Sequence, residues 1–263
     1  MSVLSYLENL ASNAILGSKE EESIEISINT LRSRLNNYFG NELIKHFKFG
    51  SSTRNTILPR KMDDNSDIDY MIVFEDDSYK PQTYLNKIKR FAEYYYSQSE
   101  IYQDNPVIVL DLNHIKFELV PALQTYHNGE YKIPDKSNSY NDWIYTSPNE
   151  FNQDLTNKNQ ENNYKIKPTI RLVKYWNALR GHLFISYLKE KDIVDKYFFN
   201  CINLKDYFFE YMLSLDNFNY NYQKTIDEVK RAKTIIKKVQ ELEDNNMPIS
   251  AENEIKKLLP EIN

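Results

Sequence analysis

Two acidic residues at the start of an apolar run constrain this chain more than any other feature. Residues 67–74 read Asp-Ile-Asp-Tyr-Met-Ile-Val-Phe. Alternation along a strand puts Asp67 and Asp69 on one face, whereas Ile68 and Tyr70 point to the other. Adjacent carboxylates repel each other unless a cation lies between them, and hard oxygen ligands suit Mg²⁺. The pattern predicts a strand that presents a carboxylate pair to a divalent cation.

A Gly-Ser turn precedes this strand. Gly50 lets the backbone approach an anion closely. The amides of a following helix, the Ser51 hydroxyl and that of Ser52 can then donate to phosphate oxygens. An ordinary helix cap is the alternative interpretation of the turn, and a polar strand edge is the alternative for the acidic pair. Together, the two features favour a site that holds a nucleoside triphosphate and its metal ions.

A third carboxylate is needed for two-metal phosphoryl transfer. Glu118 is flanked by Phe117 and Leu119, and a charge in such a strand is expected to be paired or bound to metal. Asp111 is the other candidate, but its place beside Asn113 is better explained by a turn. We therefore expect two Mg²⁺ ions, which Mn²⁺ could replace, at a triad whose members are Asp67, Asp69 and Glu118.

The C-terminal part contributes further candidates on helices. Lys174 could bind phosphate, although a solvated lysine is the usual interpretation. Ser186 and Tyr187 follow twelve residues later, and core packing is their alternative explanation. Only the combination with the first motif makes these three residues functional candidates. The cleft between the two halves of the chain is the expected place for the ligand.

Composition excludes several classes of protein. The chain has 263 residues with 41% apolar residues, enough for a large core. A net charge of −5 argues against the binding of long DNA or RNA. The basic residues of 230–238 fit a solvated helix face. Four histidines without ligand spacing argue against zinc, and one cysteine excludes an internal disulfide framework. Lacking a signal peptide or membrane span, the protein is expected to be cytoplasmic and soluble. A monomer is also expected.

The order of predicted elements gives an α+β architecture. Helices are expected over 3–15, over 18–39 with a capping box at Ser18 and Glu21, over 80–97 and through most of the chain from 167. Strands are expected over 43–49 and 67–75, with a hairpin formed by 107–111 and 115–120. Residues 124–164 read as a long ordered loop region. The predicted domains are a core over 1–164 and a helical lobe over 165–263, with the active site in the cleft between them.

These residues resemble the bacterial CD-NTases, relatives of cyclic GMP-AMP synthase and oligoadenylate synthase within the polymerase-β-like superfamily. The resemblance covers about residues 20–190. It rests on Phe-Gly-Ser-Ser from position 49, the Asp-x-Asp strand, Phe-Glu-Leu-Val-Pro-Ala from 117, Tyr-Lys-Ile-Pro-Asp from 131 and Arg-Leu-Val-Lys-Tyr-Trp-Asn from 171. The first two are typical of the superfamily. The later blocks point to this family.

The resemblance implies roles for single residues. Asp67, Asp69 and Glu118 would bind metal, Ser51, Lys174 and Ser186 would contact the triphosphate, and Tyr187 would stack on a base. Glu118 departs from the pattern, which usually has Asp there. So does the stretch after Tyr187, where Lys and Glu stand at 189 and 190.

The implied activity is synthesis of a cyclic di- or oligonucleotide from NTPs with release of pyrophosphate, in anti-phage signalling. A regulatory protein partner could control it. Two alternatives remain open: a nucleotidyltransferase with another acceptor (a protein, a small molecule or an RNA end), and a catalytically dead nucleotide-binding module.

Overall fold

A computed structural model describes residues 2–104, 106–135, 137, 142–215 and 222–262. It consists of two compact units. The core unit comprises residues 17–60 and 65–153, and the helical unit comprises residues up to 16, 61–64 and from 154 onward.

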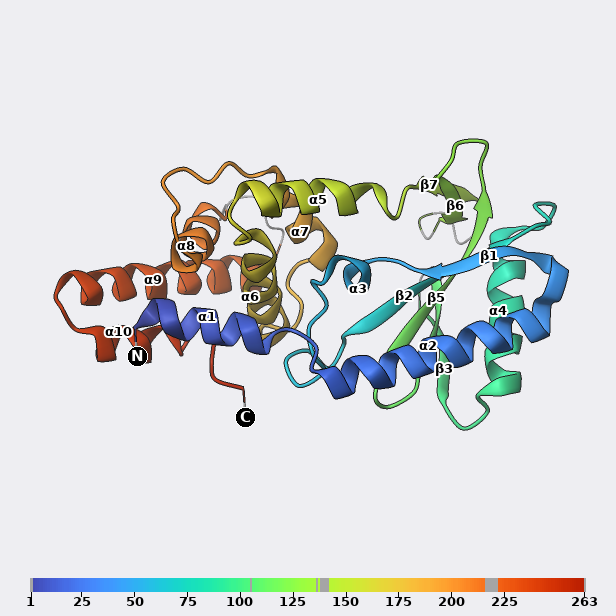
Figure 1. Ribbon diagram of the computed structural model, residues 1–263, viewed down its shortest axis with the longest axis horizontal. Coiled ribbons are helices and arrows are strands. Elements are labelled where there is room, and N and C mark those ends of the chain that lie inside the picture. Colours follow the sequence, from blue (N-terminus) through green and yellow to red (C-terminus); the bar gives the residue numbers. More distant parts are fainter. Residues whose placement is uncertain (1, 105, 136, 138–141, 216–221, 263) are drawn as a thin grey trace. The chain divides into compact units, whose positions relative to one another are not determined.

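The core unit is built on a seven-stranded sheet within the described residues (Figure 1). Its strands are β1 (Leu43–Lys48), β2 (Asp67–Phe74), β3 (Glu100–Asp104), β4 (Val107–Asp111), β5 (Lys116–Gln124), β6 (Tyr131–Pro134) and β7 (Trp143–Thr146). The order is β1-β2-β5-β4-β3, and β6 joins β5 to β7. β2 and β5 are parallel, and every other pair is antiparallel. The core unit's helical segments are α2 (Ser18–Phe39), η1 (Gly40–Glu42), α3 (Ser51–Arg54) and α4 (Pro81–Tyr95).

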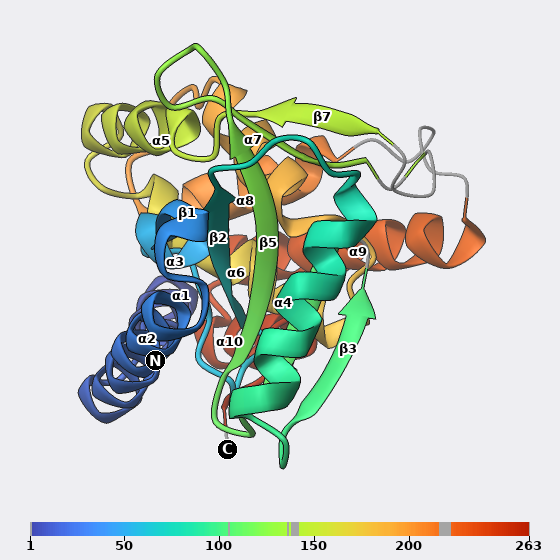
Figure 2. The same cartoon turned by 90° about the vertical axis from the view of Figure 1, so that its right-hand side faces the viewer.

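Period-2 alternation divides the two faces of β2 as the sequence predicts. The buried side chains of Ile68, Tyr70 and Phe74 face the long helices. The Phe74 ring lies 5.4 Å from that of Phe39 in α2 and 5.0 Å from that of Tyr84 in α4. Figure 2 shows α4 beside the sheet. One face of the sheet is therefore closed by helices.

The opposite face of β2 begins with the two aspartates and then becomes apolar. Met71 and Val73 pack there in a buried cluster with Ala122 of β5 and Tyr131 of β6. The acids thus occupy one end of a face whose other end is closed by hydrocarbon.

Helix α2 forms for the expected reason, with one correction. Its buried stripe consists of Ile24, Ile28, Leu31, Leu35 and Phe39. The helix begins at Ser18, but Gly17 is its N-cap and no side chain caps it. The capping box predicted at Ser18 and Glu21 was wrong, because Ser18 is already helical and so cannot be the cap residue.

The segment 124–164 was also predicted wrongly, since it contains β6, β7 and α5 (Glu150–Glu161). Both strands have only four residues, too few to show alternation against a background rich in turn-forming residues. Edge strand β3 was not predicted. The β4–β5 hairpin is confirmed, and Asp111 accepts a hydrogen bond from the Asn113 amide at 2.9 Å, as a turn residue does.

The helical unit contains α1 (Val3–Asn13), most of α5, α6 (Ile166–Leu179), α7 (Ser186–Asp195), α8 (Leu204–Ser214), α9 (Gln223–Asp244) and α10 (Pro248–Ile255). Helix α1 packs against α6, α8 and α10, and the Tyr6 hydroxyl donates to the Leu259 carbonyl at 2.7 Å. The first helix thus groups with the C-terminal helices, whereas the sequence division placed it in the core. Within the described chain, no helix combines the length and apolarity needed to cross a bilayer.

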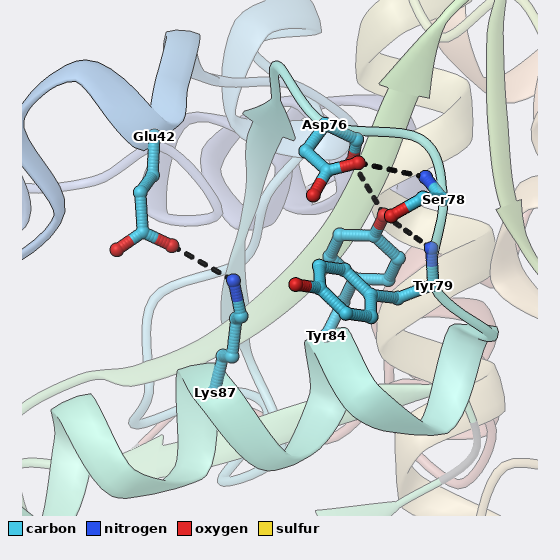
Figure 3. Close-up of polar contacts among 6 residues, drawn as sticks. All are labelled: Glu42, Asp76, Ser78, Tyr79, Tyr84 and Lys87. Carbon is cyan, nitrogen blue, oxygen red and sulfur yellow. Dashed lines mark hydrogen bonds and ion pairs between the residues drawn. The ribbon is translucent and has the colours of Figure 1, made fainter.

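The C-terminal end of β2 is tied to α4 by a network around Tyr84 (Figure 3). The Tyr84 hydroxyl donates to the Asp76 carbonyl and accepts from the Tyr79 amide at 3.3 Å. The Asp76 carboxylate accepts from the Ser78 amide at 2.9 Å, and Lys87 of α4 bonds Glu42 of η1 at 2.8 Å. These contacts fix the turn that follows β2.

Tyr84→Phe is expected to destabilise the core unit by about 0.5–1.5 kcal/mol, because it removes the hydroxyl that bonds both the Asp76 carbonyl and the Tyr79 amide. Tyr79→Phe is the matched control, since its half-exposed hydroxyl has no part in this network. Urea unfolding of both variants checks the difference. Equal stability of the two would show that the Tyr84 hydroxyl contributes nothing.

Candidate active site

Parallel pairing of β2 with β5 brings the predicted triad together. Asp69 is the direct partner of Glu118, and Asp67 is the partner of Lys116. Neighbouring strands lie about 4.8 Å apart, and residues on the same face of paired strands are neighbours. Asp67, Asp69 and Glu118 therefore share one small area of the sheet, within the core unit.

Glu118 carries the electrostatic signature of this crowding. Its pKa is raised from 4.5 to about 8, first by burial and then by the negative charges of Asp67 and Asp69. Asp104 adds to the effect, whereas the nearby Lys116 lowers the pKa. Sequence analysis missed these last two residues. If Asp69 pairs with Glu118 in parallel strands, the residues two positions earlier, Asp67 and Lys116, also pair, so Lys116 could have been found from the sequence.

The three carboxylates have the chemistry of a divalent-cation site but not its geometry. Among the residues that the structure describes, no three His, Cys, Asp or Glu side chains are arranged so that they could hold a metal ion as they stand. The chemistry of the donors still suits Mg²⁺, because carboxylate oxygens are its preferred ligands and a cation would relieve the repulsion that raises the Glu118 pKa. A metal at this triad accordingly stays a proposal.

The Gly50 turn lies directly against the acids. Gly50 has a φ of +72°, and a Cβ added to it would lie 1.8 Å from Asp69 Oδ2. The Phe49 amide also donates to the Asp69 carbonyl at 2.9 Å. Only glycine meets both requirements, a positive φ and room for the carboxylate. The predicted turn and carboxylate pair are thus in contact.

Ser51 and Ser52 differ in their surroundings. The Ser52 hydroxyl donates to the Phe49 carbonyl at 3.1 Å, so it serves the turn itself. Ser51 is the first residue of α3 and is half-buried. Its carbonyl accepts from the Thr56 amide at 3.1 Å. Of the two, Ser51 is the better placed to contact a ligand.

The remaining candidates belong to the helical unit. Lys174 is 9% exposed and its Nζ lies 3.4 Å from the carboxylate of Glu190, which is 1% exposed. A solvated lysine is therefore excluded. Ser186 begins α7, and Tyr187 is 46% exposed, so the alternative of a core tyrosine is wrong.

Glu118→Gln is expected to change how stability depends on pH in metal-free protein. Between about pH 4.5 and 8 the folded wild type keeps a proton that the unfolded chain has lost, so its stability falls as the pH rises. The variant lacks this slope and gains in melting temperature relative to wild type toward pH 8. Adding Mg²⁺ at pH 8 should raise the melting temperature of wild type more than that of the variant. A difference independent of pH would contradict the shifted pKa.

Gly50→Ala is expected to displace the Asp69 carboxylate and to lower stability by more than Gly129→Ala. Gly129 also has a positive φ, +85°, but nothing lies within 4 Å of an added Cβ. The control thus reports backbone strain alone, and the excess loss at Gly50 reports the overlap with Asp69. Thermal unfolding measures both. Equal losses would refute the close contact.

Residues 1–159, more than half of the chain, match the family model of the Second Messenger Oligonucleotide or Dinucleotide Synthetase domain, SMODS. A probable cyclic nucleotide synthase of Bacillus cereus (strain VD146) is 32% identical over 138 residues, which are 48% of this chain and 41% of that relative. The match thus spans less than half of the relative's length.

Solved structures share the fold at low identity. CdnC of E. coli MS115-1 with ATP has a TM-score of 0.73 at 13% identity, covering 99% of this chain and 98% of that one. E. coli DncV bound to 3'-deoxy GTP has a TM-score of 0.73 at 10% identity, covering 96% and 95%. The fold class is therefore the predicted α+β, polymerase-β-like architecture. With its SMODS domain, the chain belongs to the CD-NTase family of nucleotidyltransferases.

Proposed function

We propose that this protein makes a cyclic di- or oligonucleotide from nucleoside triphosphates and releases pyrophosphate. The observation that carries the proposal is the register that places Asp69 opposite Glu118, with Gly50 against Asp69. Acids, turn and short helix then form one surface, suited to a triphosphate and the hydroxyl that attacks it.

Each core residue has a distinct part in this reaction. The Gly50 turn lets the backbone approach the phosphates, and the Ser51 hydroxyl and the first amides of α3 donate to phosphate oxygens. Asp67, Asp69 and Glu118 would hold two Mg²⁺ ions, which, when bound, supply activation of the attacking hydroxyl and neutralisation of the leaving pyrophosphate.

Proton acceptance is assigned to Glu118. Bound Mg²⁺ would offset the negative charges of Asp67 and Asp69 and keep Glu118 ionised, and only an ionised carboxylate can accept a proton. The attacking group is a 3′- or 2′-hydroxyl of a bound nucleotide. Its oxygen forms the new bond to the α-phosphorus, the bond to pyrophosphate breaks, and the proton passes to Glu118 with the assistance of Asp67.

The helical unit supplies the remaining proposed contacts. Lys174 and Ser186 would bind the triphosphate, with Glu190 holding the Lys174 side chain in place at 3.4 Å. The exposed ring of Tyr187 would stack on a base, a contact that tolerates different bases.

The biological setting belongs to the same proposal. The SMODS family is named for second-messenger synthesis, and such a product would activate an effector in bacterial anti-phage defence. A structure of CdnC in complex with a HORMA protein has a TM-score of 0.70 to this chain. We propose that a protein partner binds and regulates this enzyme.

Substituting both Asp67 and Asp69 by Asn is expected to abolish product while leaving the fold intact, because neutral amides cannot hold the divalent ions that the reaction needs. Wild type and variant are incubated with four NTPs and Mg²⁺, without added acceptor, and the products are analysed by mass spectrometry after phosphatase treatment. A phosphatase-resistant nucleotide from wild type alone supports cyclisation.

Other outcomes separate the alternatives. Pyrophosphate release by the double variant would contradict the assigned triad. Wild type that reacts only with an added protein, small molecule or RNA would be a transferase with another acceptor. Nucleotide binding without turnover under every condition would identify a non-catalytic module.

A further inference from the structure

Helix α3 carries Ser51 but is too short to hold itself. It has only four residues, and a single helical turn is unfavourable because its nucleation fixes several residues for one hydrogen bond. Its position must therefore come from tertiary contacts. Gly50, directly before α3, lies against the Asp69 carboxylate. The other contacts come from a segment about a hundred residues further along the chain.

The first turn of α5 supplies them, from residues that group with the core unit. Asn152 Nδ2 donates to Thr53 Oγ1 at 3.2 Å, and Thr53 Oγ1 donates to the Gly50 carbonyl at 2.8 Å. The Arg54 guanidinium lies 5.5 Å from the centre of the Phe151 ring, and both side chains are buried. Two adjacent residues of α5 thus contact two adjacent residues of α3.

This chain of contacts ends at the catalytic machinery. Asn152 orients the Thr53 hydroxyl, that hydroxyl fixes the Gly50 carbonyl, and the Gly50 backbone touches the Asp69 carboxylate. Neither α5 residue needs to touch a nucleotide in order to affect how the turn meets one. We propose that Phe151 and Asn152 are positioning residues for the Gly50–Ser51 turn, so that the first turn of α5 sets the affinity for the triphosphate. This inference rests on the proposed function.

The proposal predicts the same loss of affinity for every NTP. The turn would contact phosphates, which all NTPs share, so a loosened turn weakens ATP, GTP, CTP and UTP alike. A residue that selected a base would affect them unequally. Weakened binding should raise KM more than it lowers kcat, because the acids themselves stay on their strands.

Asn152→Ala tests the hydrogen bond between Asn152 and Thr53. Loss of one positioning hydrogen bond is expected to raise KM roughly tenfold for every NTP that the enzyme uses. Thr53→Val removes the same link from the other side together with the bond to the Gly50 carbonyl, so the double variant should be no worse than Thr53→Val alone. Thr53→Ser, which keeps the hydroxyl, should restore the wild-type KM. Asp154→Asn is the matched control, because Asp154 is an exposed residue two positions along the same helix.

Hydrogen exchange gives a readout that does not depend on activity. The Thr53 amide bonds the Gly50 carbonyl and the Thr56 amide bonds the Ser51 carbonyl, so exchange at both should accelerate in Asn152→Ala and in Phe151→Leu. Exchange along β2 should stay at the wild-type rate. Acceleration in both segments would indicate general destabilisation and would overturn the positioning role.

The two proposals fail in different ways. Wild-type KM and wild-type exchange in Asn152→Ala would overturn the positioning role and leave the synthase reaction standing. Additive effects of Asn152→Ala and Thr53→Val would overturn it too. If the wild type neither binds nor converts NTPs, the proposed function fails, and the exchange measurement still decides whether α5 orders the turn.

Discussion

The parallel pairing of β2 with β5 is the constraint on which the site depends. Strands distant in sequence meet in a register that sets Asp69 beside Glu118, and a slip by one residue would place the carboxylates of β2 and the carboxylate of β5 on opposite faces. That slip is opposed by hydrocarbon on both faces: Tyr70 and Phe74 are buried on one side, Met71 and Val73 on the other. The burial and the repulsion that raise the Glu118 pKa are both unfavourable for a charged carboxylate, so the apolar part of the same strands must hold the acids together.

Much of the core could be predicted from the sequence because its elements are long and periodic. The stripe of α2 and the alternation of β2 each repeat often enough to fix both type and orientation. The wrong predictions concern elements in which the hydrophobic pattern repeats too few times to be recognised. Strands β6 and β7 have four residues each, and α5 is rich in Asn and Gln, so nothing in their composition outweighs the turn-forming residues around them. Strand β6 forms because β5 extends past its pairing with β4 and offers Leu123 and Gln124, and β7 then pairs with β6. These partners exist only in the folded sheet.

The candidate site was predictable to the extent that chemistry restricts position. A glutamate between Phe117 and Leu119 is expected to be paired or bound to metal, and this expectation, with the need for a third carboxylate, favoured Glu118 over Asp111. Which of two adjacent serines faces a ligand depends on the path of one turn, and the Ser52 hydroxyl is directed to a backbone carbonyl instead. The burial of Lys174 against Glu190 was equally invisible, since a lysine on a helix is usually solvated. These residues are defined by neighbours that only the fold provides.

Under the proposed function, the core unit recognises the part of the substrate that all nucleotides share. The core unit presents carboxylates, a glycine turn and backbone amides, all of which address phosphates and the metal ions that accompany them. Nothing in that set distinguishes one base from another. The proposal gives contact with a base to Tyr187, whose ring is exposed and whose stacking would tolerate different bases. Under this proposal, a change at Tyr187 would affect the choice of base, whereas a change in the β2–β5 register would remove the chemistry itself.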